Sequence, residues 1–258
     1  MSILQNYQNK FKHLYEYFNK YIEDISFFNF NHIYYTDNMK EDIFLFCKPG
    51  DTEDLNNYGA VVTANDIIED MIVLIDISES DDLMQSQSLI HELIHVVDYN
   101  NFATHYLNGD LTLINSHKLK KDYVSWSEFR AFSIAQIKCY EYMDFVCSTS
   151  YTRDIINQYE LNIEDFLKRQ HALVKSGHFS EYELSKVFGS IYLLDNYHNI
   201  ENIKNSYIYK YLPILFKTDL IYPMYELYSL YFDSDRNQKI FENLNQICAI
   251  HNKFFQSQ

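Results

Sequence analysis

Residues 87–98 read Q-S-L-I-H-E-L-I-H-V-V-D, which places an H-E-x-x-H pattern inside an apolar run. On an α-helix, residues four apart lie one above the other, so His91 and His95 can present two imidazole nitrogens to one ion. Apolar residues occupy most of the other positions, as is typical of a buried helix. Because buried polar side chains need partners, the pattern predicts a buried helix whose two histidines bind a metal ion.

Glu92 follows the first histidine and is rotated from it by about 100° on a helix. This position suits a general base that reaches a metal-bound water without binding the metal itself. The alternative is a pair of solvated histidines on a surface helix, and the apolar flanks disfavour it. We therefore expect one catalytic Zn²⁺ ion, with Glu92 as the catalytic base.

A catalytic zinc ion takes three protein ligands and keeps a fourth position for water. The continuation H-E-x-x-H-x-x-G-x-x-H is excluded, because Asp98 and Asn101 stand where it requires Gly and His. Glu128 is the best candidate for the third ligand, since it has apolar neighbours in a segment expected to form a second helix. His105 and His117 are its competitors, although each is expected in the polar loop between the two helices.

For Glu128, Asp98 and Arg130 the sequence is compatible with more than one role. Glu128 can alternatively pair with Arg130 or Lys121 on a solvated face. Asp98 shares a face with both histidines and could ligate the metal, but a carboxylate there more often orients a ligating histidine through its second ring nitrogen. Arg130 can anchor either carboxylate or bind a carboxylate of the substrate, and the sequence does not choose among these roles.

Composition limits the partners of the chain. With 36 acidic and 21 basic residues, the net charge is −15, which argues against nucleic acid and anionic membranes as partners. The charge says little about the expected protein or peptide substrate, apart from a weak preference for basic ones. No signal peptide is expected, and no apolar run is long enough for membrane insertion. The cysteines form no C-x-x-C pair, so reduced and mostly buried thiols in a cytoplasmic or other reducing compartment are expected. They are Cys47, Cys139, Cys147 and Cys248.

Hydrophobic periodicity predicts an α+β fold with a small mixed or antiparallel sheet, an active-site helix and a mostly helical C-terminal half. The expected strands are residues 33–35, 43–47, 60–63 and 71–75. The expected helices are residues 3–25, the metal helix from a cap at Ser78 or Ser80 to about Phe102, a second long helix from Lys120 or Ser125 to Cys147, and most of residues 151–258. The strand before the metal helix is expected to bind substrate by strand addition.

Two segments, H-E-L-I-H-V-V-D and S-E-F-R-A-F-S-I-A-Q-I-K-C, resemble the mitochondrial metallopeptidase family that matures a subunit of the ATP synthase. The resemblance covers about residues 59–139 and implies a zincin fold. It also implies the zinc ligands His91, His95 and Glu128, the base Glu92, and family-typical positions at Asp98, Arg130 and Cys139. The chain departs from the family in its longer linker between the motifs and in lacking the extra cysteines and histidines after the first motif. Residues 151–258 have no counterpart, and neither the mitochondrial address nor the substrate is carried over.

These features predict a gluzincin-like zinc endopeptidase that hydrolyses peptide bonds with a zinc-bound water and Glu92 as general base. Residues 1–150 would form the zincin-like catalytic core and residues 151–258 a helical subdomain packed on it. A tyrosine or histidine of the helical half would stabilise the oxyanion, with His178, Tyr123 and Tyr192 as candidates. One alternative is a protease toxin or effector delivered into another cell without a cleaved signal peptide. The other is a catalytically inactive zincin-like binding module, against which the intact Glu92 argues.

Overall fold

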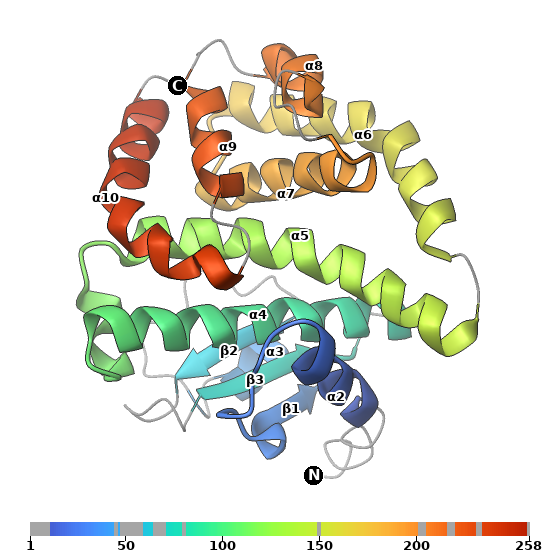
Figure 1. Ribbon diagram of the computed structural model, residues 1–258, viewed down its shortest axis with the longest axis vertical. Helices are drawn as coiled ribbons and strands as arrows, with labels where there is room; N and C mark the ends of the chain where they lie inside the picture. The colour runs from blue at the N-terminus through green and yellow to red at the C-terminus, as the bar shows by residue number, and fades with distance from the viewer. Residues whose placement is uncertain are drawn as a thin grey trace. The chain divides into compact units, whose positions relative to one another are not determined.

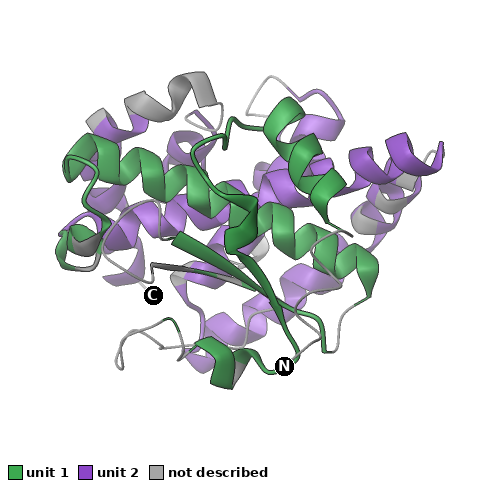
Figure 2. Ribbon diagram, turned by 90° about the horizontal axis from the view of Figure 1, so that it is seen from below, with its two compact units in different colours: residues 1–117 green, residues 118–258 purple. Residues whose placement is uncertain are grey.

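The computed structural model has a mixed α+β fold, as the sequence predicts, and most of its described residues are helical (Figure 1). The described residues are 11–43, 46, 59–63, 71–78, 81–148, 151–200, 205–215, 220–230 and 234–256. Two compact units, residues 1–117 and 118–258, are distinguished by their internal contacts (Figure 2).

Unit 1 contains a three-stranded mixed sheet and one long helix. Its elements are α2 (Lys12–Tyr21), η1 (Phe30–His32), β1 (Ile33–Thr36), α3 (Met39–Asp42), β2 (Gly59–Thr63), β3 (Met71–Asp76), α4 (Asp82–Tyr106) and η4 (Leu111–Ser116). The central strand is β3, which pairs with β1 in parallel and with β2 in antiparallel orientation. The expected small mixed sheet is therefore confirmed, together with three of its four strands.

The sequence of β3 reads M-I-V-L-I-D, and its first five residues are all buried. Ile72 and Leu74 pack with Met39 and Ile43 in one apolar cluster. The alternate residues of β3 point to the opposite face, where they are buried as well. A strand covered on both faces requires a continuous apolar run. Helix α4 packs against β2 and β3 and so lies along the sheet (Figure 1).

The strand expected at residues 43–47 is wrong at both of its described residues, because Ile43 follows α3 as its C-terminal cap and Phe46 lies in a turn. The apolar character of Ile43 is explained by its packing against β3 from a helix end, a position that needs an apolar residue as much as a strand does. Residues 44, 45 and 47 lie outside the described residues. The first helix is found as α2, within the expected 3–25, and residues 1–10 are likewise outside the described part.

Helix α4 begins one residue after an aspartate cap. The Asp81 carboxylate accepts a hydrogen bond from the Met84 N–H at 2.8 Å, which satisfies one of the free donors of the first turn. A cap at Ser78 is wrong, because its hydroxyl donates to the Asp76 carboxylate at 2.7 Å. Ser80, the other expected cap, lies outside the described residues.

Helix α4 extends to Tyr106, about one turn beyond the expected end. There Leu107 and Gly109 both donate backbone hydrogen bonds to the carbonyl of Ala103. Asn108 and Gly109 have positive φ values of 51° and 86°, a conformation that glycine and asparagine adopt most readily and that ends a helix.

Helices are the regular elements of unit 2 in its described residues. Its elements are α5 (Lys120–Cys147), α6 (Tyr151–Ser176), α7 (Glu181–Tyr197), α8 (Tyr207–Leu215), α9 (Ile221–Leu230) and α10 (Ser234–Gln256). Both the long helix expected up to Cys147 and the helical character after residue 151 are confirmed. Helix α5 packs mainly against α7, where Phe129 and Phe188 contact Tyr228 of α9 at ring-centroid distances of 5.5 and 5.4 Å.

The division at residue 117 differs from the boundary expected at residue 150, because α5 packs with α6, α7 and α10. Which residues make up a catalytic core is a functional question, so that part stays a prediction. Among the helices in the described ranges, none combines the length and hydropathy needed to span a bilayer.

Candidate metal centre

Helix α4 presents the two histidines of the H-E-x-x-H pattern side by side. The Nε2 atoms of His91 and His95 lie 3.1 Å apart, and the two rings meet edge to face with their centroids 4.7 Å apart. His95 is buried, with 3 % of its surface exposed, and His91 is half-buried. The four-residue spacing thus produces the pair of nitrogens that the sequence predicts.

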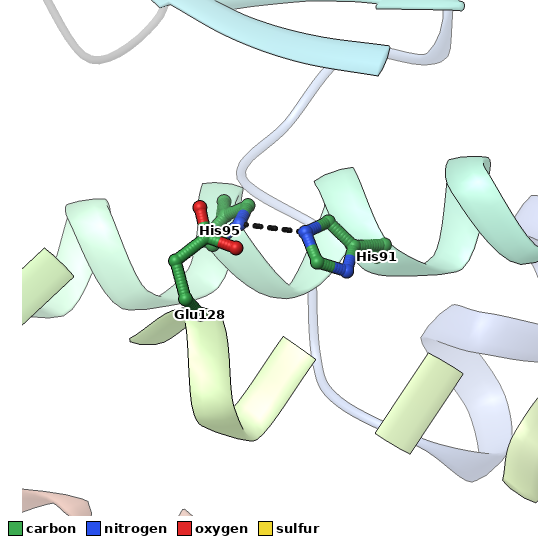
Figure 3. Close-up of side chains that lie close together, drawn as sticks. All are labelled: His91, His95 and Glu128. Carbon is green, nitrogen blue, oxygen red and sulfur yellow. Dashed lines mark hydrogen bonds between the residues drawn. The ribbon is translucent and has the colours of Figure 1, made fainter. Parts of the chain in front are cut away.

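Glu128 of α5 joins these histidines in a group of three side chains that can each offer one ligand atom (Figure 3). The three ligand atoms all lie within 4.8 Å of one another. Glu128 is half-buried, and its Oε2 atom is buried. The rival candidates Asp98, His105 and His117 lie in the described part of the chain and are not members of this group.

The geometry of the group is compatible with a tetrahedral metal ion. Nitrogen and oxygen ligands about 2.0–2.1 Å from a zinc ion are roughly 3.3 Å from one another. The two histidine nitrogens, at 3.1 Å, have this spacing as they stand. The widest separation in the group, at most 4.8 Å, exceeds it by no more than about 1.5 Å, which a change of side-chain rotamer at Glu128 can cover. The three residues can therefore hold a metal ion.

Glu92 points toward the sheet. It is 6 % exposed, and its side chain lies against Gly59 at the start of β2. A Cβ atom on Gly59 would be 2.8 Å from both Cγ and Oε1 of Glu92. Sequence reasoning missed this contact, since it joins residues far apart in the chain and a glycine adds nothing to a hydrophobic pattern.

Tyr99 is a second neighbour of the site that sequence reasoning missed. Its ring stacks on the imidazole of His95, with a centroid distance of 5.7 Å and an interplanar angle of 25°. The signal was present in the sequence, because residues 95 and 99 are separated by the same four-residue step as the two histidines. The stack restricts the orientation of the His95 ring.

Asp98 and Arg130, the expected supporting residues, are both fully buried at 0 % exposure. The Arg130 guanidinium lies 5.8 Å from the ring of Trp126. Around Glu128, residues 125–127, 129 and 130 are buried, so the alternative of a solvated face for this part of α5 is wrong. Whether Asp98 and Arg130 orient the ligands stays a prediction.

His105 and His117, the rival ligands, belong to an aromatic cluster at the C-terminal end of α4. His105 contacts Tyr106 at a centroid distance of 4.6 Å, and His117 contacts Tyr106 at 5.0 Å and Phe102 at 5.2 Å. Ten helical residues separate His95 from His105, which corresponds to about 15 Å along the axis. This distance explains why His105 is not in the metal group.

The three candidates for oxyanion stabilisation occupy different environments. Tyr123 is buried against Trp126 and Phe241 and so has a core position in unit 2. Tyr192 is half-buried and packs edge-on against Phe129. His178 is exposed and contacts Ser176. None of these contacts assigns an oxyanion role.

The three described cysteines are free thiols. Cys139 is buried, and burial raises the pKa of its thiol to about 12. Cys248 is half-buried and Cys147 is exposed, so the expectation of mostly buried thiols is right for Cys139 alone among them. Cys47 lies outside the described residues.

The chain matches no known family model, and neither its sequence nor its fold finds a match among the curated proteins or the solved structures.

Proposed function

We propose that this chain is a zinc-dependent endopeptidase of the gluzincin type. One observation carries the proposal: the ligand atoms of His91, His95 and Glu128 lie within 4.8 Å of one another, beside a buried glutamate in the sequence H-E-x-x-H. Two imidazoles and one carboxylate are a common ligand set of catalytic zinc, with a fourth position left for water. A purely structural zinc site is usually closed by four protein ligands.

The residues of this chain would divide the work of hydrolysis. A zinc ion in the group would supply Lewis acidity toward the scissile carbonyl and toward water. The Glu92 carboxylate would accept a proton from the attacking water and pass it to the amine nitrogen of the leaving peptide. Burial of Glu92 at 6 % exposure limits competing solvent around the carboxylate.

An extended peptide would be bound at β2 and not at the strand directly before the metal helix. β3 cannot accept an added strand, because β1 and β2 occupy both of its edges, so that expectation is wrong. β2 is at the edge of the sheet formed by the described strands, and its Gly59 lies against Glu92. A peptide paired with β2 would therefore run close to the base, with main-chain hydrogen bonds supplying affinity.

Zinc content is the first test. We expect purified protein to hold about one zinc ion per chain, and His91→Ala and Glu128→Ala to lose it, because each removes a ligand. Elemental analysis after gel filtration measures this directly. Wild-type protein without zinc, or His91→Ala with undiminished zinc, would sink the assignment.

The second test separates the base from the ligands. Glu92→Gln should keep zinc and melting temperature near the wild-type values, while cleavage of fluorescein-labelled casein falls at least about a hundredfold, the scale of a lost general base. Glu164→Gln, at an exposed position on α6, is the matched control and should cleave normally. Normal cleavage by Glu92→Gln would mean that Glu92 is not the base. A wild-type protein that holds zinc and cleaves nothing would favour a binding module.

A further inference from the structure

The close approach of Glu92 to Gly59 requires that residue 59 has no side chain. It does not require a backbone conformation that only glycine adopts. Gly59 lies outside the set of residues with positive φ, so its backbone conformation is open to any residue. It pairs with Ile75 in the regular antiparallel register of β2 and β3. On folding into a strand, glycine loses more conformational entropy than alanine does. The glycine therefore carries a stability cost that the backbone itself does not explain.

Space explains it. The three atoms nearest to a Cβ on residue 59 would all belong to Glu92, at 2.8 Å for Cγ, 2.8 Å for Oε1 and 3.1 Å for Cδ. Contacts this short require movement, and the part that moves most easily is the flexible side chain of Glu92. An added methyl group would therefore displace the carboxylate and leave the backbones of β2 and α4 nearly in place.

We infer that Gly59 is a positioning residue: its bare backbone forms the wall against which the Glu92 carboxylate is held. The inference rests on the proposed function in one respect, since Glu92 matters for catalysis only if it is the base. Displacement of a reacting group by about 1 Å can cost on the order of a hundredfold in rate. The atoms nearest to a Cβ at Gly59 belong to Glu92 and not to a proposed metal ligand, so metal binding should not depend on Gly59.

The steric part of the inference is tested without metal or substrate. Melting temperatures of chelator-treated wild type, Gly59→Ala, Glu92→Ala and the double variant form a cycle. In the Glu92→Ala background the space is vacated, so Gly59→Ala should raise the melting temperature by about 2 °C through the gain in strand preference. In the presence of Glu92 the same substitution should give no gain or a loss. Equal shifts in the two backgrounds, or failure to fold in both, would overturn the inference.

Gly189→Ala is the matched control. A Cβ on Gly189 would lie 2.9 Å from Cβ of Phe132, which is nearly as short as the shortest distance at Gly59 but involves no carboxylate. We expect it to lower the melting temperature equally with and without Glu92, because its neighbours are residues of α5. If the melting-temperature shift of Gly189→Ala depends on Glu92 as strongly as that of Gly59→Ala does, the cycle reports general destabilisation. That result would overturn the inference.

The catalytic part has its own measurement. Gly59→Ala should retain the zinc content and the KM for labelled casein, while kcat falls roughly 10- to 100-fold. Unchanged kcat, or a parallel loss of zinc, would contradict a role in positioning the base. Wild-type protein that neither holds zinc nor cleaves casein would instead refute the proposed function, and the melting-temperature cycle would still decide whether Gly59 places Glu92.

Discussion

Asp98 is a fully buried carboxylate on the same helix as the two candidate histidine ligands. Measured along a helix, it lies seven residues from His91, or about 10 Å, which is too far for its short side chain to share an ion held between the two histidines. It is one turn from His95, close enough to accept a hydrogen bond from an imidazole nitrogen that faces away from the metal. Asp98 is therefore expected to orient a ligand.

We expect Asp98→Asn to keep zinc but to lower its affinity about 10- to 100-fold, the usual effect of losing such a carboxylate. A competition titration with a zinc chelator measures the change, with Glu128→Ala as the comparison that should lose zinc outright. The opposite pattern, in which Asp98→Ala loses the metal and Glu128→Ala keeps it, would make Asp98 the third ligand.

The predictable part of the candidate site is the part that is local in sequence. His91, Glu92 and His95 follow from helical spacing alone, and Glu128 followed from the need for a third ligand in a second helix. The Gly59–Glu92 contact could not be predicted, because its information lies in an absent side chain and in a long-range approach of strand to helix. The Tyr99–His95 stack follows from the four-residue spacing on a helix. In a chain with 24 tyrosines, however, one tyrosine at this spacing is too weak a signal to be singled out.

At the scale of elements, α4 depends on its cap at Asp81, which bonds the Met84 N–H at 2.8 Å. Asp81→Ala leaves that N–H without its acceptor and should lower the free energy of unfolding by about 1 kcal/mol, within a range of roughly 0.5–2. Urea unfolding followed by circular dichroism gives the value. Asp81→Asn is the matched variant and should lose much less, since asparagine caps nearly as well. An equal loss in both variants would show that the charge, not the cap, matters.

Helices were easier to predict than the details of the sheet. The long helices α4 and α5 were predicted because their apolar residues extend over many turns and their ends carry breaking residues such as Gly109. The error at Ile43 arose because a short apolar run fits a strand and a packed helix end equally well. The order β1-β3-β2 was not predicted, since pairing partners depend on tertiary contacts that periodicity does not encode.

At the scale of the whole molecule, one thiol and two tyrosine hydroxyls with raised pKa values predict that the fold loses stability at alkaline pH. Burial raises the pKa of the Cys139 thiol to about 12, and burial together with a hydrogen bond to Glu160 raises the pKa of the Tyr207 hydroxyl to about 12. Burial and the nearby Asp195 carboxylate raise the pKa of Tyr225 well above its ordinary value. In the unfolded chain these groups ionise near pH 9–10, so the folded form holds more protons above that pH.

Stability contributed by these groups should be fully present below about pH 9 and be lost progressively as the pH rises toward 12. Melting temperatures measured from pH 8 to 11 test this, with absorbance of tyrosinate followed in parallel. Cys139→Ala should lose less of its stability over that interval than wild type, whereas Cys147→Ala, at an exposed position, should follow wild type. A melting temperature that stays constant to pH 11 would contradict the argument.

The mixed pairing of β3 has a consequence for how the chain assembles. β2 ends at Thr63 and β3 begins at Met71, whereas the parallel partner β1 ends at Thr36. For a flexible chain, closing residues 37–70 costs about 1.4 kcal/mol more in entropy than closing residues 64–70. Forming the antiparallel β2–β3 pair first therefore costs less loop-closure entropy than forming the β1–β3 pair first. In the chain order, α4 is the next element after β3. The residues that place Glu92 and the two histidines therefore belong to one continuous stretch, Gly59 to Tyr106. We expect this stretch to be able to assemble before β1 pairs with β3.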